Sequence, residues 1–172
     1  ENPPTYDRLA DEFAWQKTYE SEKKRRKQAE PFLSRISGIV KWIRLNLKKP
    51  RLIRTAATQI EEVRALHPGK TQFNLVDVGC GGGEKTVQIP AFLVAQGQDP
   101  VSPIGVEVSQ VLAAQAHQRF GEFGGQCIEC PAIEGVNQLD QDSVHLVILS
   151  SFLEHEIDPV GLLSASHHKL VK

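Results

Sequence analysis

A glycine-rich segment in the middle of the chain holds the residues whose types and spacing point most directly to chemistry. The apolar run Asn74–Val78 leads into a turn with glycines at Gly79, Gly81 and Gly83, and Asp77 precedes the first of them by two residues. Glycine permits a sharp turn and lets a ligand approach the backbone closely. A helix that starts after such a turn offers unpaired N–H groups to an anion. The segment therefore predicts a binding site for an anionic or carboxylate-bearing ligand.

The glycine spacing argues against a dinucleotide fingerprint. That pattern is Gly-x-Gly-x-x-Gly, and counting from Gly79 or from Gly81 puts Glu84 or Thr86 at the third glycine. The pattern present, Asp-x-Gly-x-Gly-x-Gly, resembles motif I of class I S-adenosylmethionine-dependent methyltransferases. The resemblance implies S-adenosylmethionine as cofactor, with the leading acid near its amino group. In this chain it assigns the following residues to cofactor binding: Asp77, Gly79, Cys80, Gly81 and Gly83.

A second landmark follows at Ile104–Ser109, a short apolar run that contains an acid, Glu107. It resembles the second strand of the same family. A carboxylate at the end of this strand can accept hydrogen bonds from both ribose hydroxyls, as the corresponding acid of dinucleotide sites does. The resemblance therefore implies that Glu107 and the adjacent Val108 contact the cofactor.

A third landmark spans residues 142–155 and resembles the family's fourth strand with the loop after it. The resemblance places Ser150 in the cofactor site, and a Glu154-His155 pair followed by Asp-Pro is typical of the small-molecule and lipid or sugar branches. A histidine can act as a general base on an acceptor hydroxyl or amine, so His155 and Glu154 are the candidate catalytic residues. The alternative is that Glu154 braces the loop and His155 is a lid residue.

Two positions depart from the family pattern. The family often has an acid after the third strand, where this chain has Cys130-Pro131-Ala132-Ile133. Ala132 and Ile133 are assigned to cofactor binding by position, without an acid to contact the adenine amino group. His145 stands where an aspartate is usual, and its role is expected to be structural.

Alternating apolar runs and helical patterns surround these motifs. Strands are predicted at Phe73–Val78, Ile104–Val108, Gln126–Glu129 and Val144–Ser150, and helices at Glu84–Gln96, Gln110–Phe120 and Pro159–Val171. Strands that alternate with helices form parallel sheets covered on both faces. The predicted fold class is therefore α/β, a Rossmann-like doubly wound, mostly parallel sheet of the class I methyltransferase type. Pro90 is expected to kink or split the helix in which it lies.

The charge distribution divides the chain. Residues 1–70 hold 16 of the 20 Lys and Arg and 9 of the 21 Asp and Glu, so their balance is +7, whereas residues 71–172 carry −8. Apolar stripes at helical spacing run through the first part. We therefore predict an N-terminal helical cap region at 1–70 and an S-adenosylmethionine-binding Rossmann-like domain at 71–172.

The basic run at residues 23–27 is open to two interpretations. Glu20 and Glu22 can pair with Lys24 and Arg26 at i,i+4 spacing, which favours a solvated helix face. The same run could instead hold RNA through its phosphates.

The three cysteines are an odd number, which argues against a disulfide framework and for a reducing, cytoplasmic location. Cys127-x-x-Cys130 is half of a zinc site or a redox pair, but the sequence has no second such pair, so no metal is expected. No apolar run approaches the roughly 20 residues that span a bilayer.

Together these features predict an S-adenosylmethionine-dependent methyltransferase that transfers a methyl group to an O, N or C nucleophile of a small-molecule acceptor. Two alternatives stay open: an RNA methyltransferase that uses the basic N-terminal helices, and a non-catalytic binding module with the methyltransferase fold. The family's sheet has seven strands and only four are identified here. We therefore expect the sequence to be part of a longer protein whose C-terminal strands are missing from it.

Overall fold

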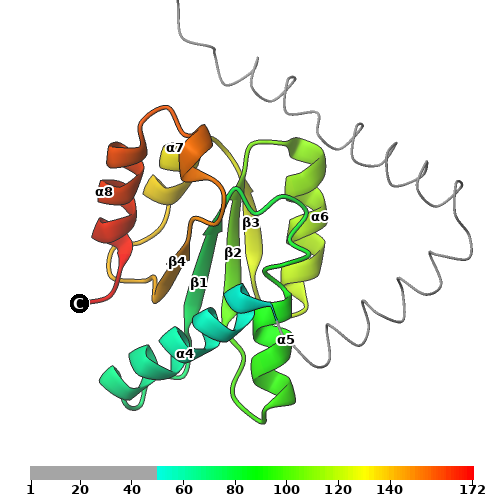
Figure 1. Ribbon diagram of the computed structural model, residues 1–172, viewed down its shortest axis with the longest axis vertical. Coiled ribbons are helices and arrows are strands. Elements are labelled where there is room, and N and C mark those ends of the chain that lie inside the picture. Colours follow the sequence, from blue (N-terminus) through cyan, green and yellow to red (C-terminus); the bar gives the residue numbers. More distant parts are fainter. Residues whose placement is uncertain (1–49) are drawn as a thin grey trace, which may run out of the picture. The chain divides into compact units, whose positions relative to one another are not determined.

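The structure, a computed structural model, describes residues 50–172, and the chain from Leu52 onward forms one compact unit (Figure 1). Its elements are α4 (Arg51–Leu66), β1 (Asn74–Val78), α5 (Gln88–Ala95), β2 (Ser102–Glu107), α6 (Gln110–Gly121), β3 (Gln126–Glu129), α7 (Ala132–Asn137), β4 (Leu146–Ile148), the 3-10 helix η1 (Leu153–His155) and α8 (Pro159–Lys169). The basic run at 23–27 and most of the predicted cap region lie outside the described residues.

The four strands form one parallel sheet in the order β3-β2-β1-β4. The chain moves outward from β1 to β2 and β3, then returns to place β4 on the other side of β1. This reversal of strand order is the switch point of doubly wound folds, where ligands bind beside the carboxyl ends of the strands. The predicted α/β, Rossmann-like parallel sheet is confirmed.

Successive side chains of a strand point to opposite faces of the sheet, so the apolar strands of this sheet have apolar side chains on both faces. Helices cover both of these faces. Leu75 packs in one cluster with residues of α4 and α5, while Val76 packs in the other with residues of α7 and α8. Phe120 of α6 lies against Gly105 of β2. Figure 1 shows α5 and α6 on one side of the strands and α7 and α8 on the other.

The predicted helix at 84–96 begins later than expected. Residues 84–87 form turns, and α5 starts at Gln88, which places Pro90 in its first helical turn. The first N–H groups of a helix have no partner within the helix, so a proline costs little there. The proline therefore lies in the first turn of a shorter helix and does not break a longer one.

Helix α4 packs against the sheet and contributes to its hydrophobic core. The sequence prediction had placed the residues of this helix in the N-terminal cap region. Ile53, Ala56, Ala57 and Ile60 are buried at i, i+3, i+4 and i+7 and pack in one cluster with Leu75. The division of the chain at residue 70 stays a prediction. Among residues 50–172, no helix combines the length and the apolar character needed to cross a bilayer.

Candidate functional site

The glycine loop after β1 depends on backbone conformations that L side chains rarely adopt. Gly79, Gly81 and Gly83 have φ angles of +69°, +57° and +78°. A Cβ atom on Gly79 would lie 2.1 Å from Cδ2 of Phe152, and one on Gly83 would lie 2.7 Å from Cε1 of Phe120. A Cβ on Gly81 would meet no heavy atom within 4 Å. Two glycines therefore permit close packing, and Gly81 borders open space.

Glu107 ties this loop to the neighbouring strand. Its Oε2 accepts a hydrogen bond from the Gly81 N–H at 3.0 Å, and its Oε1 accepts one from the Ser109 N–H at 2.9 Å. A carboxylate has about four lone-pair positions, so these two bonds leave acceptor capacity. The acid predicted for the second strand therefore lies beside the glycine loop, with both oxygens oriented by backbone groups.

Asp77 lies below the loop and is only 8% exposed. The Thr86 hydroxyl donates a hydrogen bond to its Oδ2. Burial raises the pKa of the Asp77 carboxyl from its ordinary 3.8 to about 6, against the opposing effects of the Thr86 hydrogen bond and the Lys85 charge. The Asp77 carboxylate is therefore hydrogen-bonded to Thr86, a residue that follows the glycine turn.

The raised pKa of Asp77 predicts a pH effect on stability. Because the folded chain binds this proton more tightly than the unfolded chain, the group's contribution is full below pH ~4 and is lost as the pH rises through about 6. Urea unfolding between these values should therefore give a free energy of unfolding that falls with pH more steeply for the parent than for Asp77→Asn. The exposed Asp140→Asn should follow the parent, and equal slopes for all three would contradict the assignment.

Arg119 of α6 also contacts the glycine loop. Its guanidinium donates to the Gly82 carbonyl and lies 3.1 Å from Oε1 of Glu84. The Cys80 thiol extends in another direction, and its Sγ lies 3.7 Å from Sγ of Cys127 in β3. The loop thus contacts α6 through Gly82 and β3 through Cys80.

The remaining predicted residues follow the carboxyl ends of their strands. Val108 follows β2 and is half-buried, and Ser150 follows β4 and is exposed. Ala132 and Ile133 begin α7, the first buried and the second half-buried. The parallel topology brings all of these segments to the edge that carries the glycine loop.

The candidate catalytic pair lies in η1, after β4. Glu154 and His155 are both exposed, and the His155 N–H donates to the Phe152 carbonyl at 2.9 Å. Because Phe152 packs against Gly79, η1 is held close to the glycine loop. The structure therefore brings this segment to the same edge as the predicted cofactor residues.

The sequence prediction missed several contacts of the glycine segment, among them those of Phe152, Thr86 and Arg119. Phe152 stands two residues before Glu154 in a segment already singled out, so its position was a usable signal. Thr86 and Arg119 lie in helical or turn patterns in which polar residues are ordinary. Nothing in their local sequence distinguishes them from solvated side chains.

His145 is buried beside the first residue of β1. The side chain is 6% exposed, and its Nδ1 accepts a hydrogen bond from the Asn74 N–H at 3.0 Å. Burial, assisted by the charge of Lys70, lowers the pKa of this imidazole to about 4. The neutral ring therefore anchors the start of β1.

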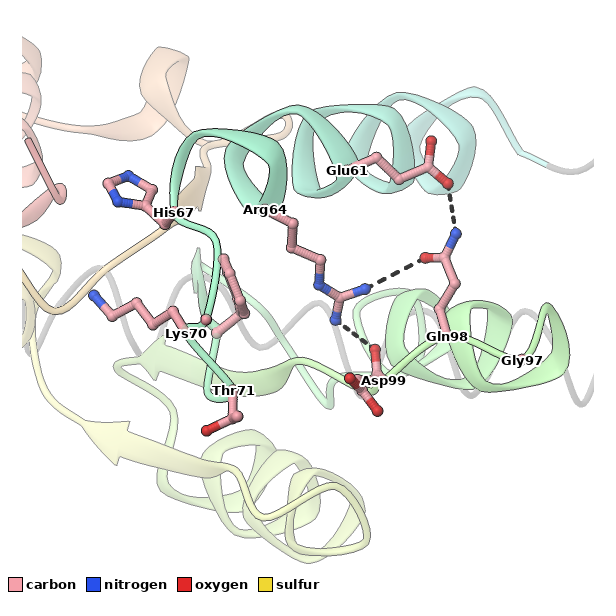
Figure 2. Close-up of a pocket in the computed structure, with 10 residues that line it drawn as sticks. Glu61, Arg64, His67, Lys70, Thr71, Gly97, Gln98 and Asp99 are labelled. Carbon is pink, nitrogen blue, oxygen red and sulfur yellow. Dashed lines mark hydrogen bonds between the residues drawn. The ribbon is translucent and has the colours of Figure 1, made fainter.

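A pocket of about 420 Å³ lies away from the glycine loop, where α4 and the turn after it meet the turn between α5 and β2 (Figure 2). Its Arg64 donates to the Gln98 side chain and the Asp99 carbonyl, and its guanidinium lies 5.2 Å from the centre of the Phe73 ring. Gln98 in turn donates to Glu61 (Figure 2). These bonds fasten α4 to the α5–β2 turn, which is a structural role.

A parallel doubly wound sheet with a glycine turn at its carboxyl edge defines the described unit as a Rossmann-like α/β protein. The sequence matches no protein-family model and no curated protein.

Several solved structures are similar to it. One is the Haemonchus contortus phosphoethanolamine N-methyltransferase 2 in complex with phosphomonomethylethanolamine and S-adenosylhomocysteine, at 22% identity over 66% of this chain and 25% of that chain, with a TM-score of 0.46. A second is an S-adenosylmethionine-dependent methyltransferase from Geobacter sulfurreducens in complex with S-adenosylhomocysteine, at 17% identity over 72% and 45%, with a TM-score of 0.46. A third is the [4+2]-cyclase SpnF, at 20% identity over 69% and 42%, with a TM-score of 0.47.

The chain spans between a quarter and just under half of the length of these three structures. At such identities and TM-scores, the similarities by themselves assign neither an activity nor a cofactor to this chain.

Proposed function

We propose that the described unit binds S-adenosylmethionine at the glycine loop, and that the protein is a methyltransferase acting on a small-molecule acceptor. The observation that carries the proposal is the hydrogen bond between Gly81 and Glu107. It joins the glycine turn to the acid of the second strand at the carboxyl edge of the sheet. The Asp-x-Gly-x-Gly-x-Gly pattern around it favours this cofactor over a dinucleotide.

The residues present fit such a cofactor. The space beside Gly81 is open to the approach of a ligand, and the Glu107 carboxylate keeps acceptor positions for ribose hydroxyls after its two backbone bonds. When bound, the cofactor would supply an electrophilic methyl group on a sulfonium. Asp77, Gly79, Cys80, Gly83, Val108, Ala132, Ile133 and Ser150 complete the proposed binding residues.

The proposed role of η1 concerns the acceptor. His155 is a candidate general base that would take a proton from an acceptor hydroxyl or amine, and Glu154 would orient the segment. Their exposure leaves them open to a molecule bound over the carboxyl edge of the sheet. The chain's main contribution to the reaction would be to hold the acceptor in line with the methyl group and to exclude water.

Calorimetric titration of the chain with S-adenosylmethionine, S-adenosylhomocysteine and NAD tests the cofactor. We expect the first two to bind at micromolar level, about −8 kcal/mol, and NAD to give no response. Tight binding of NAD without a response to S-adenosylmethionine would contradict the proposal.

The acceptor is tested separately, with the full-length protein, the methyl-labelled cofactor and cell extracts divided into small-molecule and RNA fractions. We expect label in the small-molecule fraction. Label in RNA, with salt-sensitive retention of the chain on RNA, would favour the RNA alternative. Cofactor binding without transfer to either fraction would favour a non-catalytic module.

A further inference from the structure

Two cysteines that are far apart in the sequence come together where the glycine loop approaches β3. Cys80 lies in the loop and Cys127 in β3, and their Sγ atoms are 3.7 Å apart. Both side chains are half-buried. The third cysteine, Cys130, has its thiol near Gln138 and Glu134 instead, at 3.3 and 3.7 Å. The pair that meets is therefore different from the Cys-x-x-Cys spacing visible in the sequence.

Gly105 of β2 makes this meeting possible. It lies between Asp77 of β1 and Cys127 of β3 in the register of the sheet. A Cβ atom at Gly105 would lie 2.6 Å from Sγ of Cys80 and 2.8 Å from Sγ of Cys127. Because the middle strand has no side chain at this position, the two thiols can approach each other across it.

We propose that Cys80 and Cys127 form a reversible disulfide that turns off cofactor binding at the glycine loop. The regulatory part of this proposal rests on the proposed function. The oxidant is a small-molecule disulfide. The Cys127 thiolate attacks one of its sulfurs and releases one thiol, and Cys80 then attacks the Cys127 sulfur of the mixed disulfide and releases the second. Two S–H bonds are lost, one S–S bond forms, and two electrons pass to the oxidant, which leaves as two thiols.

The contact between the thiols sets the order of these steps. The hydrogen bond between the two thiols lowers the pKa of the Cys127 thiol, against burial and the charges of Glu107 and Asp77. The same bond, with burial, raises the pKa of Cys80. The thiolate is the reactive form, so Cys127 attacks first.

Disulfide formation requires the sulfurs to approach from 3.7 Å to about 2.05 Å. Cys127 is fixed in the β2–β3 ladder, whereas Cys80 is flanked by glycines at positive φ. The loop is therefore the part that moves. Its movement toward β3 would displace the Gly81 N–H from its position relative to Glu107, to which it is bonded at 3.0 Å. The oxidised loop would lose the arrangement proposed to hold the cofactor.

The test uses the 172-residue chain treated with oxidised glutathione. Remaining thiols are then alkylated, and the crosslink is mapped by peptide mass spectrometry. We expect a mass loss of about 2 Da before alkylation, and a Cys80–Cys127 crosslink with Cys130 alkylated after it. Calorimetric titration with S-adenosylhomocysteine should show a Kd raised at least about tenfold by oxidation and restored by dithiothreitol.

Cys127→Ser should show neither the crosslink nor the change in Kd, and Cys130→Ser should behave as the parent. A Cys127–Cys130 crosslink, or a Cys80–Cys127 crosslink with an unchanged Kd, would overturn the proposal. Crosslink mapping needs no cofactor and decides the thiol pairing by itself. A reduced chain that binds no S-adenosylhomocysteine contradicts the proposed function instead.

Discussion

Gly81→Val should abolish cofactor binding while leaving the chain folded. The Val side chain would project into the space that borders Gly81, where no heavy atom of the protein lies within 4 Å of a Cβ. We expect the Kd for S-adenosylhomocysteine to rise at least about 100-fold, equivalent to about 2.7 kcal/mol. Calorimetry measures the Kd, and circular dichroism with a thermal melt verifies folding.

Backbone strain at a positive φ needs its own control, because Val at such a position is strained wherever it stands. Gly97 has a φ of +73° and also has nothing within 4 Å of a Cβ, but it lies in the α5–β2 turn, away from the glycine loop. Gly97→Val should lose stability by a similar amount, about 1–3 kcal/mol, and keep the parent's Kd. If Gly81→Val is folded and also keeps the parent's Kd, the ligand does not approach the loop at this glycine.

Glu107→Ala should weaken cofactor binding by about 1.5–3 kcal/mol, a rise in Kd of roughly 10- to 150-fold. The substitution removes the acceptor of the Gly81 and Ser109 N–H groups as well as the proposed acceptor of the ribose hydroxyls. Glu107→Gln keeps one carbonyl oxygen and should show a smaller loss. Calorimetric titration of both variants with S-adenosylhomocysteine gives the comparison.

The sheet supplies a matched control for this acid. Glu129 ends β3 directly opposite Glu107 in the β2–β3 register, and it is exposed. Glu129→Ala removes the same charge from the same edge of the sheet and should leave the Kd unchanged. Equal losses in Glu107→Ala and Glu129→Ala would show that the edge charge, and not the contact with the glycine loop, controls affinity.

Sequence patterns predicted the strands better than the shorter helices. The buried strand before the glycine loop is rich in apolar, mostly β-branched residues, and the prediction for it differs from the structure by one residue. Helix α7 spans only six residues and follows a proline, so it has too few turns to show a 3.6-residue period. The 3-10 turn η1 escaped prediction for the same reason.

Local pattern alone determined the alternation of strands and helices, the position of the glycine turn and the acid at the end of β2. These features repeat over a few residues or depend on one backbone conformation, so they can be detected in an isolated segment. Only the tertiary structure decided that Phe152 packs on Gly79, that Arg119 bonds Gly82 and that Cys80 meets Cys127. Each of these contacts joins segments far apart in the chain. Their meeting depends on strand order, on register and on a missing side chain at Gly105, which no local periodicity encodes.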